Sequence, residues 1–166
     1  MTTKIPTYKF ALREDLKDHP EFLPTRAEPF ATGWDVRAAQ EDRKDIIIKP
    51  GEYFKIPLGF CALPPNGWWF SLHPRSSSFV KKHMHNLIGI IDEHFFLGVI
   101  AAGQYIPNKF DINAPDLVIT FGEKICQIIP EKRQEMIVQK IEKDEFEKLH
   151  SERNTIRKGG FGSTTP

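Results

Sequence analysis

The sequence has few cysteines, no long hydrophobic run and almost no net charge. Two cysteines in 166 residues exclude a disulfide-rich scaffold, and both Cys61 and Cys126 lie within apolar runs, which predicts buried, reduced thiols. No stretch approaches the length of a membrane span, and residues 1–20 contain no apolar run of signal-peptide length. We therefore expect a protein of a reducing, cytoplasmic compartment.

Charge and metal-binding motifs narrow the possible functions further. The formal net charge of +1 argues against a general binder of nucleic acid, since that affinity depends on concentrated basic charge. His83 and His85 would share one face of a strand, but no HExxH or paired CxxC motif accompanies them. Structural zinc is therefore not predicted.

Short apolar segments divided by turn signals run through the chain. Thirteen prolines would interrupt long helices, and the spacing of the segments favours an all-β sandwich, jelly roll or barrel. The expected strands lie in "DIIIKPG", "YFKIPLGFCAL", "WWFSLHP", "LIGIID", "LGVIAA", "DLVITFG", "KICQIIP" and "EMIVQKI". The best candidate for a helix is "KDEFEKLHSER", residues 143–153.

The two ends of the chain fit a sheet poorly. Residues 1–30 are polar and interrupted by proline, which predicts the start of one strand followed by loops. Residues 151–166 show no apolar periodicity, yet they hold Phe161 among glycines in "RKGGFGSTTP". We predict one β-rich domain over 1–152 and a mobile glycine-rich segment over 153–166.

Two polar segments are rich in hydrogen-bond donors. In "HPRSSSF", Arg75 offers a planar guanidinium suited to phosphate, and the serines that follow add hydroxyl and backbone N–H groups; the alternative is a surface turn. In the tail, glycines allow close approach of an anion while Ser163 and Thr164 donate. Together they indicate a multiply charged anion such as a nucleotide polyphosphate, with Phe161 placed to stack on a base.

Two carboxylates lie at candidate strand ends. Asp92 follows the apolar run "LIGII", where we expect it to be partly buried, and Asp35 lies in "ATGWDVRAA". Hydrolysis of a phosphoanhydride needs a base that orients water and a cation, usually Mg²⁺, that offsets phosphate charge. Spacing alone leaves open which carboxylate takes which role, and turn formation is the simpler alternative for each.

Five segments, in order, resemble the motifs of the trimeric dUTPase (deoxyuridine triphosphate nucleotidohydrolase) family, from about residue 25 to the end. They are "ATGWDVRAA", "PRSSSF", "NLIGIID" with "EHFFLG", "GEKICQIIP" and "RKGGFGSTT". The resemblance implies a jelly-roll-like subunit, a homotrimer with sites at subunit interfaces, and Mg²⁺-dependent hydrolysis of dUTP to dUMP and pyrophosphate. This reaction limits uracil incorporation into DNA and supplies dUMP.

The same resemblance implies roles for individual residues. Asp92 would orient the water that attacks the α-phosphorus, and Asp35 would support the hydration shell of Mg²⁺. The positions that match phosphate ligands are Arg75, Ser76, Ser77, Gln127, Arg157, Gly160, Ser163 and Thr164. The positions that match the base and sugar pocket are Asn86, Gly89, Ile91, Phe95 and Phe161. The tail would be a lid that closes over the nucleotide.

The chain departs from the family pattern in two motifs. The third motif usually reads Asp-x-Asp-Tyr-x-Gly; here His94 and Phe95 replace its second acid and its tyrosine, and one extra residue precedes Gly98. Phe95 keeps the ring beneath the sugar without the hydroxyl, and Phe96 is the alternative occupant. The fifth motif is one residue shorter, which favours Arg157 as its phosphate ligand, with Arg153 in reserve.

Three other functions compete with dUTP hydrolysis. A dCTP deaminase of the same superfamily needs a glutamate on the strand after the third motif, but that strand reads "GVIAAGQY". A pyrophosphatase with altered base or sugar selectivity would follow if the changed third motif accepts another pyrimidine nucleotide. A nucleotide-gated regulatory protein would keep the pocket and act by contacting a partner.

Overall fold

The computed structural model describes residues 5–107 and 113–153, which belong to two compact units, 1–133 and 134–166. The first unit holds the strands, two short 3-10 helices (Glu14–Leu16 and Pro20–Phe22) and α1 (Ser76–Lys82). Its strands are β1 (Lys9–Leu12), β2 (Trp34–Arg37), β3 (Ile46–Ile48), β4 (Tyr53–Pro57), β5 (Phe60–Leu63), β6 (Trp68–Pro74), β7 (Met84–Asn86), β8 (Gly89–Ile91), β9 (Ile100–Tyr105), β10 (Leu117–Ile119) and β11 (Lys124–Lys132).

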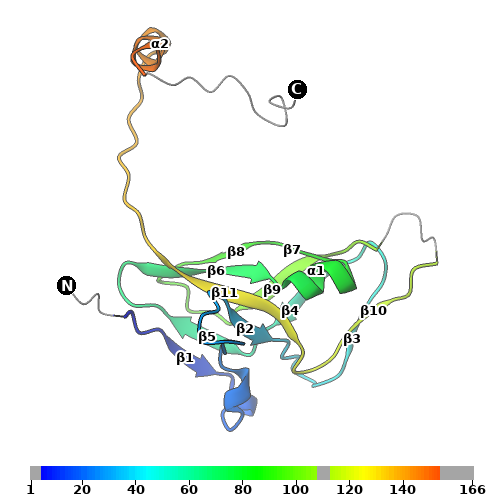
Figure 1. The fold of residues 1–166 in the computed structure, drawn as a ribbon. Helices are drawn as coiled ribbons and strands as arrows, with labels where there is room; N and C mark the ends of the chain where they lie inside the picture. Colours follow the sequence, from blue (N-terminus) through cyan, green and yellow to red (C-terminus); the bar gives the residue numbers. More distant parts are fainter. Residues whose placement is uncertain (1–4, 108–112, 154–166) are drawn as a thin grey trace. The chain divides into compact units, whose positions relative to one another are not determined.

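All strand pairs in the first unit are antiparallel. The largest sheet has the order β2-β11-β6-β8, a second has the order β4-β9-β7, and β1-β5 and β10-β3 form two-stranded pairs (Figure 1). Pro130 is tolerated within β11 because the pairing of β11 with β2 ends at Ile128, so only the β6 side needs hydrogen bonds there. The all-β prediction is confirmed.

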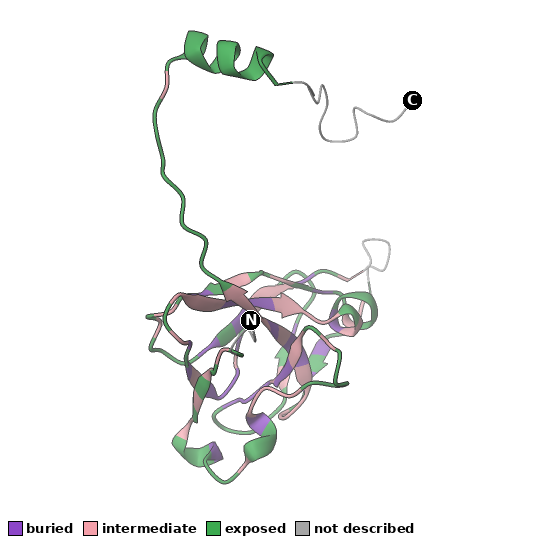
Figure 2. Cartoon of the chain, turned by 60° about the vertical axis from the view of Figure 1, so that its left-hand side comes forward, coloured by how far each residue is buried: buried purple, intermediate pink, exposed green. Residues whose placement is uncertain are grey.

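One hydrophobic core lies between these sheets. Fully buried side chains come from distant strands, among them Val36 on β2, Ile56 on β4 and Phe70 on β6. Figure 2 shows the buried positions concentrated on the strands of this unit. Burial of each large apolar side chain contributes about 1.5–3 kcal/mol, so the core stabilises the frame that carries the polar strand ends.

The N-terminal segment packs as a small second cluster. β1 pairs with β5, and the chain then folds so that Leu16 and Phe22 are buried against Ala39. Phe121 covers this cluster with its ring 5.0 Å from that of Phe22. The predicted strand start with loops in residues 1–30 is therefore confirmed over residues 5–30.

The second unit is described over 134–153, where α2 (Lys143–Ser151) confirms the predicted helix. The expected strand "EMIVQKI" is wrong, because residues 135–141 form no strand and the side chains of Met136, Ile137 and Val138 are more than four-fifths exposed. A β-branched run becomes a strand only when a neighbouring strand supplies the ladder. No boundary at 152/153 is tested by this structure, so the predicted division there stays a prediction.

Candidate functional site

Asp35 lies at the centre of a cluster of charged and polar side chains where β2, β6 and β11 meet. Its side chain is only 9% exposed, and each of its oxygens has a cationic partner. Arg75 Nε lies 2.9 Å from Oδ1, and Lys124 Nζ lies 3.1 Å from Oδ2. A nearly buried carboxylate is stable here because two cations compensate its charge.

An irregularity in β11 places Lys124 in this cluster. The register of β11 against β2 shifts between Lys124, opposite Arg37, and Cys126, opposite Val36. Such a bulge turns a side chain away from the alternation of a regular strand. Ile125, the extra residue, is buried, and its carbonyl accepts a hydrogen bond from Ser78 Oγ at 2.9 Å.

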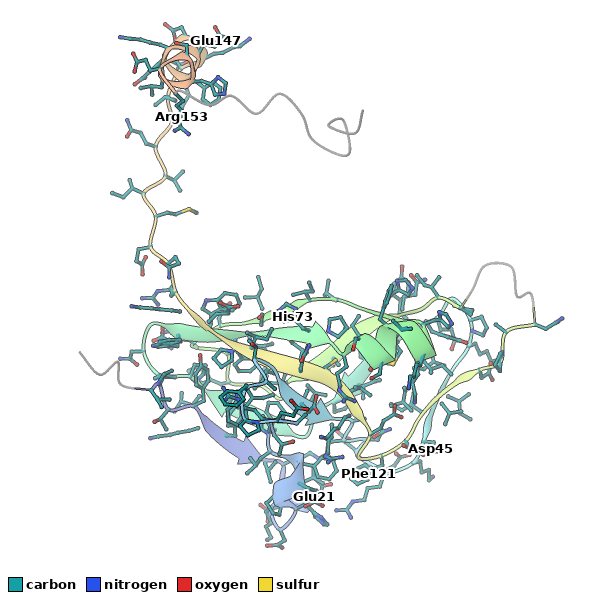
Figure 3. The ribbon with its side chains drawn as sticks, in the orientation of Figure 1. Glu21, Asp45, His73, Phe121, Glu147 and Arg153 are labelled. Carbon is teal, nitrogen blue, oxygen red and sulfur yellow. The ribbon has the colours of Figure 1, made fainter. Side chains whose placement is uncertain are left out.

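Gln127 lies beside Asp35 on the neighbouring strand, and Gly33 makes room for it. Gln127 pairs with Asp35 on one side and with His73 on the other, and its Nε2 donates to the Pro74 carbonyl at 3.3 Å. His73, the partner of Gln127 on β6, is labelled in Figure 3 and marks this end of the sheet. A Cβ on Gly33 would come within 2.1 Å of Gln127 Oε1, so only glycine fits without moving that amide.

The "PRSSSF" segment forms a short helix, α1, instead of a turn or loop, with Arg75 as its N-cap residue. Ser78 is buried and holds the helix to β11 through its hydroxyl. Ser76 is exposed and Ser77 is half-buried, and within the part of the chain that the structure describes neither hydroxyl makes a hydrogen bond. Arg75 and Gln127 thus lie beside Asp35, and Ser76 and Ser77 follow Arg75 in the first turn of α1.

Asp92 lies at the other end of the same sheet. It follows β8, whose last residue, Ile91, pairs with Phe70, so continuing the antiparallel register by one position would place Asp92 near Trp69. Arg75 is six positions further along β6, which corresponds to about 20 Å at roughly 3.3 Å per residue. Asp92 is exposed, so the expected partial burial was wrong. Within one chain, the candidate base and the candidate phosphate ligands are far apart.

Asn86 is the last residue of β7, and Gly89 and Ile91 are the first and last residues of β8. Asn86 Nδ2 contacts Cys126 Sγ at 3.2 Å, while its buried Oδ1 has no hydrogen-bond partner among residues 5–107 and 113–153. Ile91 is 8% exposed and belongs to the hydrophobic core, so its side chain is not available to a ligand. Asn86 also lines a groove of about 810 Å³ along β4, β7 and β9, together with Phe54 and Gly103.

Both predicted thiols are free. Cys126 is buried, and burial raises its pKa to about 12, while Cys61 is half-buried. A thiol with so high a pKa stays protonated at neutral pH and packs as a small apolar group.

The two neighbouring phenylalanines after Asp92 differ in exposure. Phe95 is half-buried and packs against the core, and its N–H donates to the Asp92 carbonyl at 3.1 Å. Phe96 is 67% exposed and lies near His94, with 6.3 Å between the ring centroids. Phe96, the alternative sugar-contact residue, therefore presents the more accessible ring.

Several predicted site residues lie outside the described residues. These are Arg157, Gly160, Phe161, Ser163 and Thr164. Arg153, the reserve phosphate ligand, follows α2 and is exposed. No group of three or more histidine, cysteine, aspartate or glutamate side chains gathers within residues 5–107 and 113–153, and no helix there is long and apolar enough to cross a membrane.

Sequence reasoning missed Lys124 and Glu93. Lys124 lies in the quoted segment "GEKICQIIP", but its pairing with Asp35 depends on the neighbouring strand and on the bulge. Glu93 lies in "EHFFLG", and its partners are Gly67 and Arg133. No local pattern indicates either contact.

A match to a known sequence family shows which family this chain belongs to. The sequence model of the dUTPase family matches residues 20–165, which span every motif from Asp35 to Thr164. The chain belongs to the dUTPase family. The ordered segments of the sequence had indicated this family, and the prediction is confirmed.

Curated relatives support the same family. The deoxyuridine 5'-triphosphate nucleotidohydrolase of Finegoldia magna is 31% identical over 145 residues, covering 86% of this chain and 90% of the relative. That of Rickettsia felis is 32% identical over 145 residues, covering 86% of this chain and 87% of the relative.

Solved structures of dUTPases share the fold. The Staphylococcus bacteriophage 80alpha dUTPase with dUPNHPP aligns with a TM-score of 0.73 at 17% identity, covering 96% of this chain and 99% of that chain. The Streptococcus mutans dUTPase aligns with a TM-score of 0.65 at 23% identity, covering 78% of this chain and 98% of that chain. The predicted jelly-roll-like β fold is confirmed.

Proposed function

We propose that this dUTPase-family protein hydrolyses dUTP to dUMP and pyrophosphate. The observation that carries the proposal is the family match over residues 20–165, because it includes the phosphate-side residues on β2, β6 and β11 as well as Asp92 after β8. A nucleotide-gated regulatory protein would need the same pocket without turnover, so a measurement of turnover separates the two.

The triphosphate binds at the Asp35 end of the sheet. Arg75, Ser76, Ser77 and Gln127 converge there, and the two serine hydroxyls have no competing hydrogen bond within the described ranges. Asp35 and the Lys124 carbonyl, which accepts from Arg75 Nη1 at 3.1 Å, orient the Arg75 guanidinium so that its Nη2 can donate to phosphate oxygens. The tail completes this set through Arg157, Gly160, Ser163 and Thr164.

Asp92 acts as the base. Its exposed carboxylate accepts a proton from water while the water oxygen bonds to the α-phosphorus. The bond from the α-phosphorus to the bridging oxygen breaks, and pyrophosphate leaves. Charge that develops on the phosphate oxygens is stabilised by the donors on the phosphate side.

The residues near Asp35 fit a Mg²⁺ ion that arrives with the triphosphate. Both oxygens of Asp35 have cationic partners, yet an ionised carboxylate oxygen can accept more than one hydrogen bond, so Asp35 can still accept from a metal-bound water. Mg²⁺ commonly keeps several waters and binds through substrate phosphates, and its charge offsets theirs. A phage phi11 dUTPase is described with a structural Mg(II) ion.

The base and sugar are recognised by β7, β8 and the segment after them. β8 is the edge strand of its sheet, and its backbone at Gly89 and Ile91 reads the donor and acceptor pattern of uracil, while Asn86 supplies the amide. An unmatched buried polar group costs roughly 1–3 kcal/mol, which is enough to disfavour cytosine. Phe95, or the more exposed Phe96, lies beneath the deoxyribose, and Phe161 stacks on the base from the tail.

The separation of Asp92 and Arg75 supports a homotrimer with sites shared between chains. About 20 Å along β6 is too far for one nucleotide's α-phosphate to reach both within one chain. If the Asp92 of a neighbouring chain lies beside this chain's Arg75, one bound nucleotide can reach both side chains. The cytoplasmic, reducing setting expected from the cysteines remains part of the same proposal.

Asp92→Asn tests the proposed base. The amide keeps the shape and cannot take the proton, so turnover of dUTP should fall on the order of 10²-fold or more with binding largely retained. Turnover close to that of the unaltered protein would remove Asp92 from this role.

Mixed trimers test the shared site. Asp92→Asn and Arg75→Ala are each expected to be inactive, and in the second variant Lys124 still compensates Asp35. Unfolding and refolding the two together should restore activity in about one quarter of the sites, those that join an intact Arg75 to a neighbour's intact Asp92. A mixture as inactive as its parents contradicts sharing.

A further inference from the structure

Glu93, the residue after Asp92, joins three segments that are far apart in the sequence. Its Oε2 accepts a hydrogen bond from the Gly67 N–H at 2.9 Å and another from Arg133 Nη1 at 3.0 Å. The Arg133 N–H in turn donates to the Gly67 carbonyl at 2.9 Å. The turn before β6, the end of β11 and the segment after β8 therefore meet at one carboxylate oxygen.

The Glu93 carboxylate is shielded although its neighbours are not. Its side chain is 14% exposed, whereas Asp92 is exposed and the His94 side chain is 80% exposed. A charge-assisted hydrogen bond in such a place is stronger than a neutral one, and an ion pair fixes its direction. Glu93 is thus an anchor within an otherwise solvent-facing segment.

The backbone of Asp92 is held on both sides. Before it, Ile91 is buried and pairs with Phe70 on β6. After it, Glu93 is held by Gly67 and Arg133, and the Phe95 N–H closes a turn onto the Asp92 carbonyl. The Asp92 side chain projects from a backbone that has little freedom.

We propose that Glu93 is a positioning residue for Asp92, an inference that rests on the proposed dUTP hydrolysis. The Glu93 carboxylate faces Gly67 and Arg133, so it does not take the proton itself. Its contribution is to fix where Asp92 presents its oxygen to the attacking water. A displacement of about 1 Å at a catalytic group lowers a rate by as much as about 10²-fold.

Three variants of the full-length protein test this role in steady-state hydrolysis of dUTP with Mg²⁺. Glu93→Ala should lower kcat on the order of 10- to 100-fold with little change in KM, because the hydrogen-bond partners of Glu93 are Gly67 and Arg133, which are not proposed ligands of the nucleotide. Glu93→Gln should keep most of kcat, since its carbonyl oxygen can accept both hydrogen bonds. Glu93→Asp, one methylene shorter, should lose kcat although it keeps the charge.

Glu52→Ala is the matched control. Glu52 Oε2 accepts the Lys49 N–H at 2.8 Å and so also anchors a turn, but that turn lies before β4, a strand of a different sheet from β8. It should leave kcat unchanged. If Glu93→Ala does not fold, Glu93→Asp serves as the test instead. The positioning role is overturned if a Glu93 variant folds, has lost the contacts with Gly67 and Arg133, and still has an unaltered kcat. Failure of the unaltered protein to release pyrophosphate from dUTP would instead contradict the proposed function.

Discussion

The ion pairs of Asp35 lead to a quantitative prediction for Asp35→Ala. The substitution removes the charge-assisted hydrogen bond from Lys124 and the ion pair with Arg75. Hydrogen bonds to charged groups contribute about 1.5–3 kcal/mol each. The side chains of Arg75 and Lys124 are 31% and 29% exposed, so water compensates part of the loss after truncation. We expect the free energy of unfolding to fall by about 2–3 kcal/mol.

Urea denaturation at one fixed protein concentration measures this change, since the midpoint of an oligomer depends on concentration. Asp15→Ala is the control, because Asp15 pairs with Arg13 on an exposed part of the chain and its loss should move the midpoint far less. Combining Asp35→Ala with Lys124→Met should cost less than the sum of the two single changes. A midpoint for Asp35→Ala no lower than that of Asp15→Ala would refute the reasoning.

Three further predictions concern the thiol, the glycine beside Gln127 and the tail. Burial raises the pKa of Cys126 from 9.0, the value of an ordinary thiol, to about 12, so above pH 9.0 this thiol ionises in the unfolded chain but not in the folded one, and the free energy of unfolding should fall as the pH rises. Urea titrations at pH 8 and 10.5 should show a larger fall for the unaltered protein than for Cys126→Ala. Equal falls in the two proteins would contradict this prediction. Gly33→Ala should displace the Gln127 amide and raise KM for dUTP while the far-ultraviolet circular dichroism is kept, whereas an unchanged KM would show that Gln127 does not bind phosphate. Deletion of 154–166 should leave the core of residues 36–128 folded but abolish most turnover of dUTP. Phe161→Ala should weaken nucleotide binding by the roughly 1–3 kcal/mol typical of base stacking. Full activity of the truncated protein would contradict the role of the tail as a lid.

The strands of the core could be predicted from the sequence because the short apolar segments and the turn residues that bound them indicate the same strands. "WWFSLHP" is bounded by Gly67 and by the polar segment from Arg75, and it forms β6 over Trp68–Pro74. "EMIVQKI" has the same β-branched character but no strand, since a strand also depends on a partner that local sequence does not specify.

The candidate site could be predicted in composition but not in arrangement. Asp35, Arg75 and Gln127 are together as the family resemblance implied, but Lys124 joins them through a bulge that no periodicity indicates. Because Asp92 follows an apolar run, the sequence predicted that it is partly buried. In the structure β8 ends at Ile91, and the side chain of Asp92 is exposed to solvent. Its distance from Arg75 depends on the pairing of β6 with β8, which is a property of the fold.

Pyrophosphate release from a panel of nucleotides tests the central claim most directly. The purified protein and Asp92→Asn would each be incubated with dUTP, dCTP, dTTP and UTP, with and without Mg²⁺. We predict rapid, Mg²⁺-dependent release from dUTP alone by the unaltered protein, and release from dUTP that is slower by on the order of 10²-fold or more in the variant. No release from dUTP, or equal release from dCTP or UTP, would contradict the assignment of this chain as a hydrolase selective for dUTP.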